Sequence, residues 1–237
     1  MKDINVFGPI GDFWDDAATT ASDFAAQLKE AGGDDVTVHI NSGGGDVFDA
    51  NTMAETLRAY KGRTTASIEG LAASAASYFA LTADEVVIGP SALLMIHNPY
   101  TCCRGEASDM RKTADLLDKL RGTISAQYVK KTGMELSEVE ALMDEETWFT
   151  AEEAVERGFA DRMSDAAPVA ACIDEKMLGK FKHAPEGIAS AVEEPAGEVE
   201  PTMPPSTGEP ATEAVVDEAG AASRVVCVNG AFLKVEG

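Results

Sequence analysis

The sequence predicts an α/β fold with a mostly parallel sheet, followed by a disordered acidic tail. Short β-like runs are separated by segments with apolar residues at helical spacing, and glycines stand at many of the junctions. Strands that alternate with helices are typical of α/β domains with a parallel sheet. The composition changes after about residue 165, where prolines and acidic residues become frequent. We therefore expect one compact domain and one appended tail.

The strand and helix pattern can be followed along the chain. A glycine pair at 32–33 ends the first helix, and a glycine run at 43–45 follows the second strand. We expect a tight turn at Gly70 to separate a strand from the helix that contains Ser74. Capping boxes at 137–140 and 150–153 predict two short helices. The expected strands are 4–9, 36–40, 64–68, 85–88 and 93–96, and the expected helices lie around 21–31, 50–57, 74–81 and 108–132.

Composition excludes several classes of function. The formal net charge of the 237-residue chain is −22, which disfavours binding to the nucleic-acid backbone and to anionic membrane surfaces. No apolar run approaches the length of a membrane-spanning helix. We also expect no signal peptide, because residues 1–5 lead straight into a predicted strand. The expected location is therefore the cytoplasm. The four cysteines form no CxxC pair, so we expect free thiols, no metal site and no cofactor.

The acidic tail divides into a linker and a terminal hairpin. Between Glu193 and Glu218 there are eight acidic residues and five prolines, without lysine or arginine. Such a segment cannot bury enough apolar surface to fold. Asn229-Gly230 then lies between two apolar runs, which predicts a hairpin. The expected organisation is a compact domain at 1–165, a linker at 166–222 and a hairpin-like segment at 223–237.

Three polar or glycine-rich sites each follow a predicted strand directly. They are the glycine run that ends at Gly45, the serine at 74 and the histidine at 97. Sites in parallel sheets gather beyond the carboxyl ends of the strands, so these three can converge. A serine becomes a nucleophile when a base, a group that orients the base and oxyanion donors are in place. Ser74, His97 and a downstream carboxylate would supply the first two, and the amides of Gly45 and Ala75 the oxyanion donors. His183 lies in the tail and has no evident partner.

Four ordered motifs between about residues 4 and 163 resemble the ClpP-type serine peptidases. The segment 40–45, INSGGG, resembles the INSPGG segment of that family, and 70–75, GLAASA, resembles its nucleophile segment. The segment 95–99, MIHNP, resembles the MIHxP histidine segment, and 148–161 resembles the closing helix. Within the family, the short N-terminus and the acidic tail look most like phage prohead proteases. The resemblance implies a ClpP/crotonase-like fold of repeated ββα units.

Carried over residue by residue, the resemblance implies that Ser74 is the nucleophile and His97 the base. Gly45 and Ala75 match the oxyanion donors, while Gly43 stands where the family usually has proline. The family's third member is an aspartate, and the register set by Trp148 places Glu146 there. Asp144 is close enough in sequence to be the alternative, because a triad is identified by geometry and role rather than residue type.

The resemblance implies a serine endopeptidase without a cofactor, which acts by a Ser-His-acid triad through an acyl-enzyme. It implies a ring-like homo-oligomer, polypeptide substrates such as phage capsid or scaffold proteins, and a location in the host cytoplasm. No nucleotide-binding motif occurs in the sequence, so any ATPase would be a separate protein. Two alternatives stay open: a catalytically inactive ClpP-shaped assembly or scaffold protein, and a crotonase-type acyl-CoA enzyme.

Overall fold

The computed structural model describes residues 1–11, 18–165, 181–184, 224–228 and 231–235. A seven-stranded sheet forms its centre, and most of the linker expected at 166–222 lies outside the described residues. The strands of this sheet are β1 (Lys2–Phe7), β2 (Val36–Ser42), β3 (Thr64–Ala73), β4 (Glu85–Ile88), β5 (Leu93–Ile96), β7 (Thr147–Phe149) and β8 (Arg162–Met163).

The sheet is mostly parallel, as the sequence predicts. Its main order is β1-β2-β3-β4-β8, and all of these neighbours run parallel. The first half of β3 pairs with β4, and its second half pairs with β5. Strand β7 then adds antiparallel to β5. Because β3 serves two neighbours in succession, its carboxyl end lies between the ends of β2 and β5.

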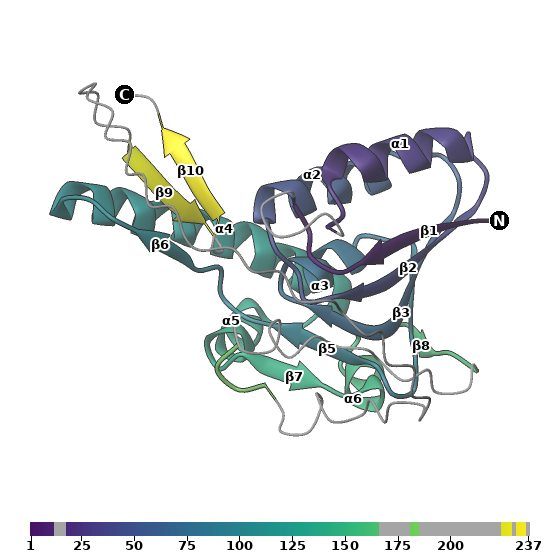
Figure 1. Cartoon of the computed structure of the whole chain (residues 1–237). Coiled ribbons are helices and arrows are strands. Elements are labelled where there is room, and N and C mark those ends of the chain that lie inside the picture. The colour runs from purple at the N-terminus through teal and green to yellow at the C-terminus, as the bar shows by residue number, and fades with distance from the viewer. Residues whose placement is uncertain (12–17, 166–180, 185–223, 229–230, 236–237) are drawn as a thin grey trace, which may run out of the picture.

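Helices cover one face of the sheet and extend beyond it (Figure 1). Helices α1 and α2 lie over the face formed by β1 to β3, and α4 extends away from the sheet beside β6. The helices are α1 (Ala21–Ala31), α2 (Val47–Arg58), α3 (Ala75–Ala80), α4 (Ala107–Thr132), α5 (Leu136–Asp144) and α6 (Ala151–Glu156). No helix in the described ranges combines the length and apolar character that crossing a membrane requires.

The core lies between the helices and the sheet. Strand β2 alternates strictly, so that Val36, Val38 and Ile40 are buried while the intervening side chains are half-buried. Phe24 of α1 and Phe79 of α3 meet edge to face, with ring centroids 5.1 Å apart. Burying one such side chain contributes about 1.5–3 kcal/mol to folding. This packing fixes α3, and with it the residue that precedes α3, against the sheet.

The C-terminal segment contains two paired strands, and Asn229-Gly230, where the hairpin turn is expected, lies outside the described residues. Strand β9 (Arg224–Val228) pairs antiparallel with β10 (Ala231–Val235). Strand β9 also pairs antiparallel with β6 (Thr101–Cys103), where Cys227 lies opposite Cys102. A two-stranded hairpin is marginal in water, and a third strand supports it. The hairpin therefore lies beside the segment that follows His97 in the chain.

Two local predictions were wrong. Strand β3 continues through Gly70 to Ala73 without the expected turn, because its second half pairs with β5. Helix α5 begins at Leu136 after the N-cap Glu135, so Ser137 lies inside the helix and does not start a capping box. The capping box at Thr150 is confirmed, since its hydroxyl accepts from the Glu153 amide and the Glu153 carboxylate accepts in return.

Candidate active site

The pairing of four strands brings the predicted site residues to one edge of the sheet. Ser42 pairs with Ala72, and Ala73 pairs with Met95. Strands β2, β3 and β5 therefore end close together, and the chain leaves them at the glycine run, the serine and the histidine. Ile96 pairs with Thr147 across the antiparallel β5–β7 ladder. Each is adjacent in sequence to a predicted site residue, His97 in one case and Glu146 in the other.

Ser74 lies on a strained turn between β3 and α3. Its φ and ψ are 56° and −125°, a conformation that L-residues rarely adopt and that costs of order 1–3 kcal/mol. The surrounding contacts hold this conformation. The amide of Ser74 donates to the carbonyl of Met95 at 3.0 Å, and its carbonyl accepts from the Ser77 hydroxyl at 2.7 Å. A sharp strand-to-helix turn of this kind leaves the serine Oγ accessible at the edge of the sheet.

The glycine loop packs directly on this turn. Gly44 has a φ of 82°, and a Cβ atom there would lie 2.6 Å from the Ala73 carbonyl and 2.8 Å from the Ala75 amide. Gly45 has a φ of 153°, and its Cβ would lie 2.1 Å from the Ile10 carbonyl. A side chain at Gly44 would push the loop away from the Ser74 turn, and one at Gly45 would clash with the backbone of Ile10. The loop and the first residue of α3 are thus close neighbours, and the role of Gly45 and Ala75 as oxyanion donors stays a prediction.

His97 is hydrogen-bonded to Ser74. Its Nε2 lies 2.8 Å from the Ser74 Oγ. Burial lowers the pKa of His97 to about 4, a shift that the charge of Glu146 opposes and that of Lys182 increases. The imidazole is therefore neutral at pH 7, and a neutral ring can accept the hydroxyl proton through an unprotonated Nε2.

Glu146 is a buried carboxylate in the turn between α5 and β7. Only 7% of the residue is exposed, and its φ is 52°. The left-handed position after a helix usually holds glycine or asparagine, and other residues there cost about 1–2 kcal/mol. A glutamate at such a position indicates a constraint other than stability. Its charge raises the pKa of His97, so the carboxylate acts on the imidazole.

Asp144, the alternative third member, has other partners. Its Oδ1 accepts from the Asn98 side-chain amide at 2.7 Å and pairs with the Arg121 guanidinium at 3.0 Å. Its side chain is 55% exposed. The structure thus brings Ser74, His97 and Glu146 to one place and directs Asp144 toward α4.

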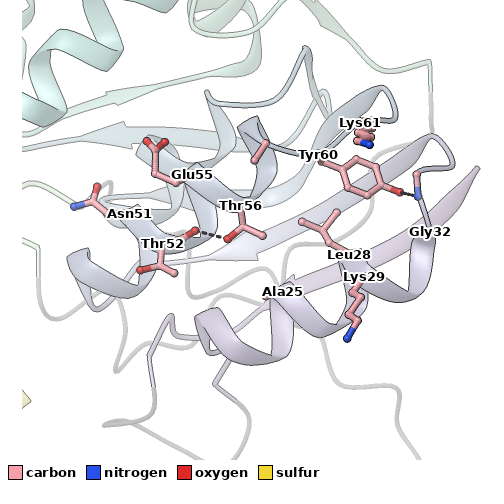
Figure 2. Close-up of a pocket in the computed structure, with 12 residues that line it drawn as sticks. Ala25, Leu28, Lys29, Gly32, Asn51, Thr52, Glu55, Thr56, Tyr60 and Lys61 are labelled. Carbon is pink, nitrogen blue, oxygen red and sulfur yellow. Dashed lines mark hydrogen bonds between the residues drawn. The ribbon is translucent and has the colours of Figure 1, made fainter.

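Two cavities lie beside the paired serine and histidine. One of about 20 Å³ is bordered by Ala75 and Tyr78 of α3 and by Ile124 and Tyr128 of α4. Another of about 320 Å³ lies on the other side of His97 and reaches Glu146 and Lys182. A separate cavity of about 830 Å³ lies between α1 and α2 (Figure 2) and includes none of the predicted site residues. In the described ranges no cluster of His, Cys, Asp and Glu is arranged to hold a metal ion.

Sequence reasoning missed the contribution of Phe181–Ala184. These residues fall in the expected linker, yet the backbone amides of Lys182 and His183 donate to the Glu146 carboxylate at 3.0 and 2.7 Å. The imidazole Nδ1 of His183, which showed no partner in the sequence, lies 2.8 Å from the Glu145 carbonyl. Backbone donors that lie 36 and 37 residues from their acceptor leave no local signal.

Comparison with known proteins agrees with this geometry. The family model described as Clp protease matches residues 11–167. The chain is also 32% identical over 156 residues to ATP-dependent Clp protease proteolytic subunit 1 of Prochlorococcus marinus subsp. pastoris, a match that covers 63% of this chain and 80% of the relative. The region that the family model matches contains Ser74, His97 and Glu146. The chain therefore belongs to the Clp protease family.

Proposed function

We propose that this chain is a serine endopeptidase in which Ser74, His97 and Glu146 form the triad. The observation that carries the proposal is the 2.8 Å contact between His97 Nε2 and Ser74 Oγ at a strained turn of a Clp protease family member. A strained serine beside a neutral imidazole is the arrangement that nucleophilic catalysis needs. The same contact disfavours a crotonase-type acyl-CoA enzyme, which does not need a serine–histidine pair.

The geometry supports a two-step acyl transfer. The Ser74 Oγ attacks the peptide carbonyl carbon while its proton passes to His97 Nε2, and the negative charge develops on the carbonyl oxygen. The amides of Gly45 and Ala75 are the proposed donors to that oxygen. His97 then gives the proton to the leaving amine, and the C–N bond breaks to leave an acyl-enzyme. Water, deprotonated by the same imidazole, releases the carboxyl product and restores Ser74.

Glu146 has an electrostatic role in this cycle. The imidazole becomes positively charged when it takes the serine proton, and burial opposes that charge. A neighbouring carboxylate stabilises the imidazolium and orients the ring. The charge of Glu146 raises the pKa of His97 in the resting site, which supports this role.

The decisive test compares the wild type with Ser74→Ala. The wild type should cleave a fluorogenic peptide and be labelled by a fluorophosphonate, because only an activated serine reacts. Ser74→Ala should lose on the order of 10⁴ to 10⁶ in rate and all labelling, while circular dichroism shows an intact fold. His97→Ala should fall within about tenfold of Ser74→Ala, since triad members act as a unit. An unlabelled wild type would instead favour the inactive assembly protein.

The substrates we propose are the capsid and scaffold proteins of a phage head, in host cytoplasm. Support comes from the acidic, proline-rich tail, which resembles that of prohead proteases. Incubation of the purified protein with phage scaffold and shell proteins, with casein as the control, tests this assignment. Defined fragments of the scaffold at catalytic enzyme concentrations are the expected result. Cleavage of casein at the same rate as scaffold would contradict it.

A further inference from the structure

Four residues beyond the expected end of the domain, Phe181–Ala184, pack against the predicted triad. The ring of Phe181 meets the His97 imidazole edge to face at 5.7 Å between centroids, and meets the Trp148 indole in the same way at 5.5 Å. Phe181 and Ala184 also pack on a small buried cluster. It consists of Leu71 and Ala73 of β3, the strand that leads to Ser74, and Met95 of β5. The segment Phe181–Ala184 is therefore held at the site by apolar packing.

The backbone of the same segment binds both oxygens of Glu146. The amide of Lys182 donates to Oε2 at 3.0 Å, and the amide of His183 donates to Oε1 at 2.7 Å. The indole Nε1 of Trp148 lies 3.5 Å from Oε1. Burying a carboxylate costs free energy, and hydrogen-bond donors such as these offset that cost.

These two hydrogen bonds from backbone amides also fix the plane of the carboxylate. A carboxylate has about four acceptor positions, so two backbone bonds leave room for an imidazole N–H. Among the described residues, no hydrogen bond joins the His97 Nδ1 to Glu146. The carboxylate acts on the imidazole electrostatically in this state, and the segment sets the distance and angle from which it does so.

We propose that Phe181–Ala184 is a positioning segment of the active site, which we call the carboxylate clamp. The amides of Lys182 and His183 hold Glu146, and the ring of Phe181 holds the face of His97 away from water. This proposal rests on the proposed triad. It also adds residues 181–184 to the catalytic unit, which was expected to end at residue 165.

The amide role is tested in the full chain with proline substitutions, which remove one N–H each. Lys182→Pro and His183→Pro are compared with Lys182→Ala and His183→Ala, which lose the same side chains but keep the N–H. We expect kcat on the pH plateau to fall about 10- to 100-fold from each alanine variant to its proline counterpart, with KM within about threefold, as outer-shell losses elsewhere suggest. Equal kcat within each pair, or a higher kcat in the proline variants, would overturn the clamp.

The role of the Phe181 ring is tested with a second pair of variants. This pair also tests the clamp if the proline variants do not fold. Phe181→Ala should lower kcat and the rate of fluorophosphonate labelling at least fivefold, and Phe181→Leu should restore most of both. Thermal unfolding of each variant separates this effect from loss of fold. Labelling of Phe181→Ala at the wild-type rate would overturn the ring role.

The pH profile gives a readout that a purely structural segment would not change. The Lys182 charge lowers the pKa of His97, so Lys182→Gln should raise it. The acidic limb of kcat/KM should then move to higher pH, whereas Lys130→Gln on the exposed side of α4 should leave it in place. An unmoved limb in Lys182→Gln would mean that the segment does not lie at the site. A wild type without fluorophosphonate labelling would refute the triad itself, which is a different result from equal labelling of all clamp variants.

Discussion

At the scale of single residues, the choice between Glu146 and Asp144 has the sharpest test. Glu146→Gln keeps the size of the side chain but removes the charge that raises the pKa of His97. We expect kcat to fall at least about 100-fold, since the loss of a triad carboxylate charge is severe. Asp144→Asn removes a half-exposed ion pair with Arg121, which is worth about 0–1 kcal/mol. Its kcat should stay within about threefold of wild type.

Peptide hydrolysis at saturating substrate checks this prediction, with thermal unfolding of both variants as the control for folding. An inactive Asp144→Asn beside an active Glu146→Gln would mean that the third member is the residue paired with Arg121. The family register through Trp148 would then be displaced by two positions.

The residues of the site were predictable from sequence to different degrees. Ser74 and His97 follow strands directly, and strand ends of a parallel sheet meet at one edge, so their approach could be anticipated. Glu146 required a family register, because no periodic pattern marks a residue in a turn. The amide donors of the clamp could not be found, since they are backbone groups that any residue except proline would supply at 182 and 183. Long-range backbone contacts carry no residue-type signal.

At the scale of elements, the helices and the strands of four or more residues were predictable, and the strands of two or three residues were not. Strand β2 alternates over seven residues, which is enough to define a period of two. Strands β6 and β7 have three residues each, too few to show any period. The extension of β3 to Ala73 was missed because Gly70 is read locally as a turn, whereas pairing with β5 overrides that preference.

Helix α4 presents an apolar surface that we expect to join subunits. Its first half leaves the domain, and Met110 and Leu116 are 42% and 38% exposed there. The double variant Met110→Gln/Leu116→Gln makes this exposed surface polar and should shift the protein toward monomer, because buried apolar area drives association. Light scattering coupled to size-exclusion chromatography at micromolar concentration gives the mass. Lys112→Gln, on the same half of the helix, should keep the wild-type mass.

Two results would contradict an assembly through α4. One is a fully active wild-type monomer at micromolar concentration. The other is a double variant with the wild-type mass and wild-type thermal stability. The first result would contradict the proposed ring-like homo-oligomer. The second would show that the subunit interface does not involve this half of α4.

At the scale of the whole molecule, the linker between Glu193 and Glu218 is expected to be a substrate of its own protease. It is rich in proline and acidic residues, and a peptidase groove accepts extended chain by adding it as a strand to a sheet edge. Intact mass spectrometry of wild type and Ser74→Ala, incubated side by side, tests this. We expect loss of a C-terminal piece in the wild type alone.

Cleavage in that linker would separate the terminal hairpin from the domain. The pairing of β9 with β6 would then no longer be supported by a covalent connection to the domain, and the piece could dissociate. A wild type that stays full-length while it cuts an added peptide would contradict self-processing. Loss of the same piece from Ser74→Ala would assign the cut to another protease.

The strained backbone of Ser74 implies a conflict between folding and reactivity at one position. Glycine adopts a φ of 56° without strain, but it loses more conformational entropy on folding. From these opposing effects we expect Ser74→Gly to be more stable than Ser74→Ala by about 1 kcal/mol, which chemical denaturation can measure. Equal or lower stability would show that the turn stores no energy. If the turn does store energy, selection for stability alone would favour glycine at position 74 and an inactive protein. The serine is then retained only while its hydroxyl is needed for catalysis.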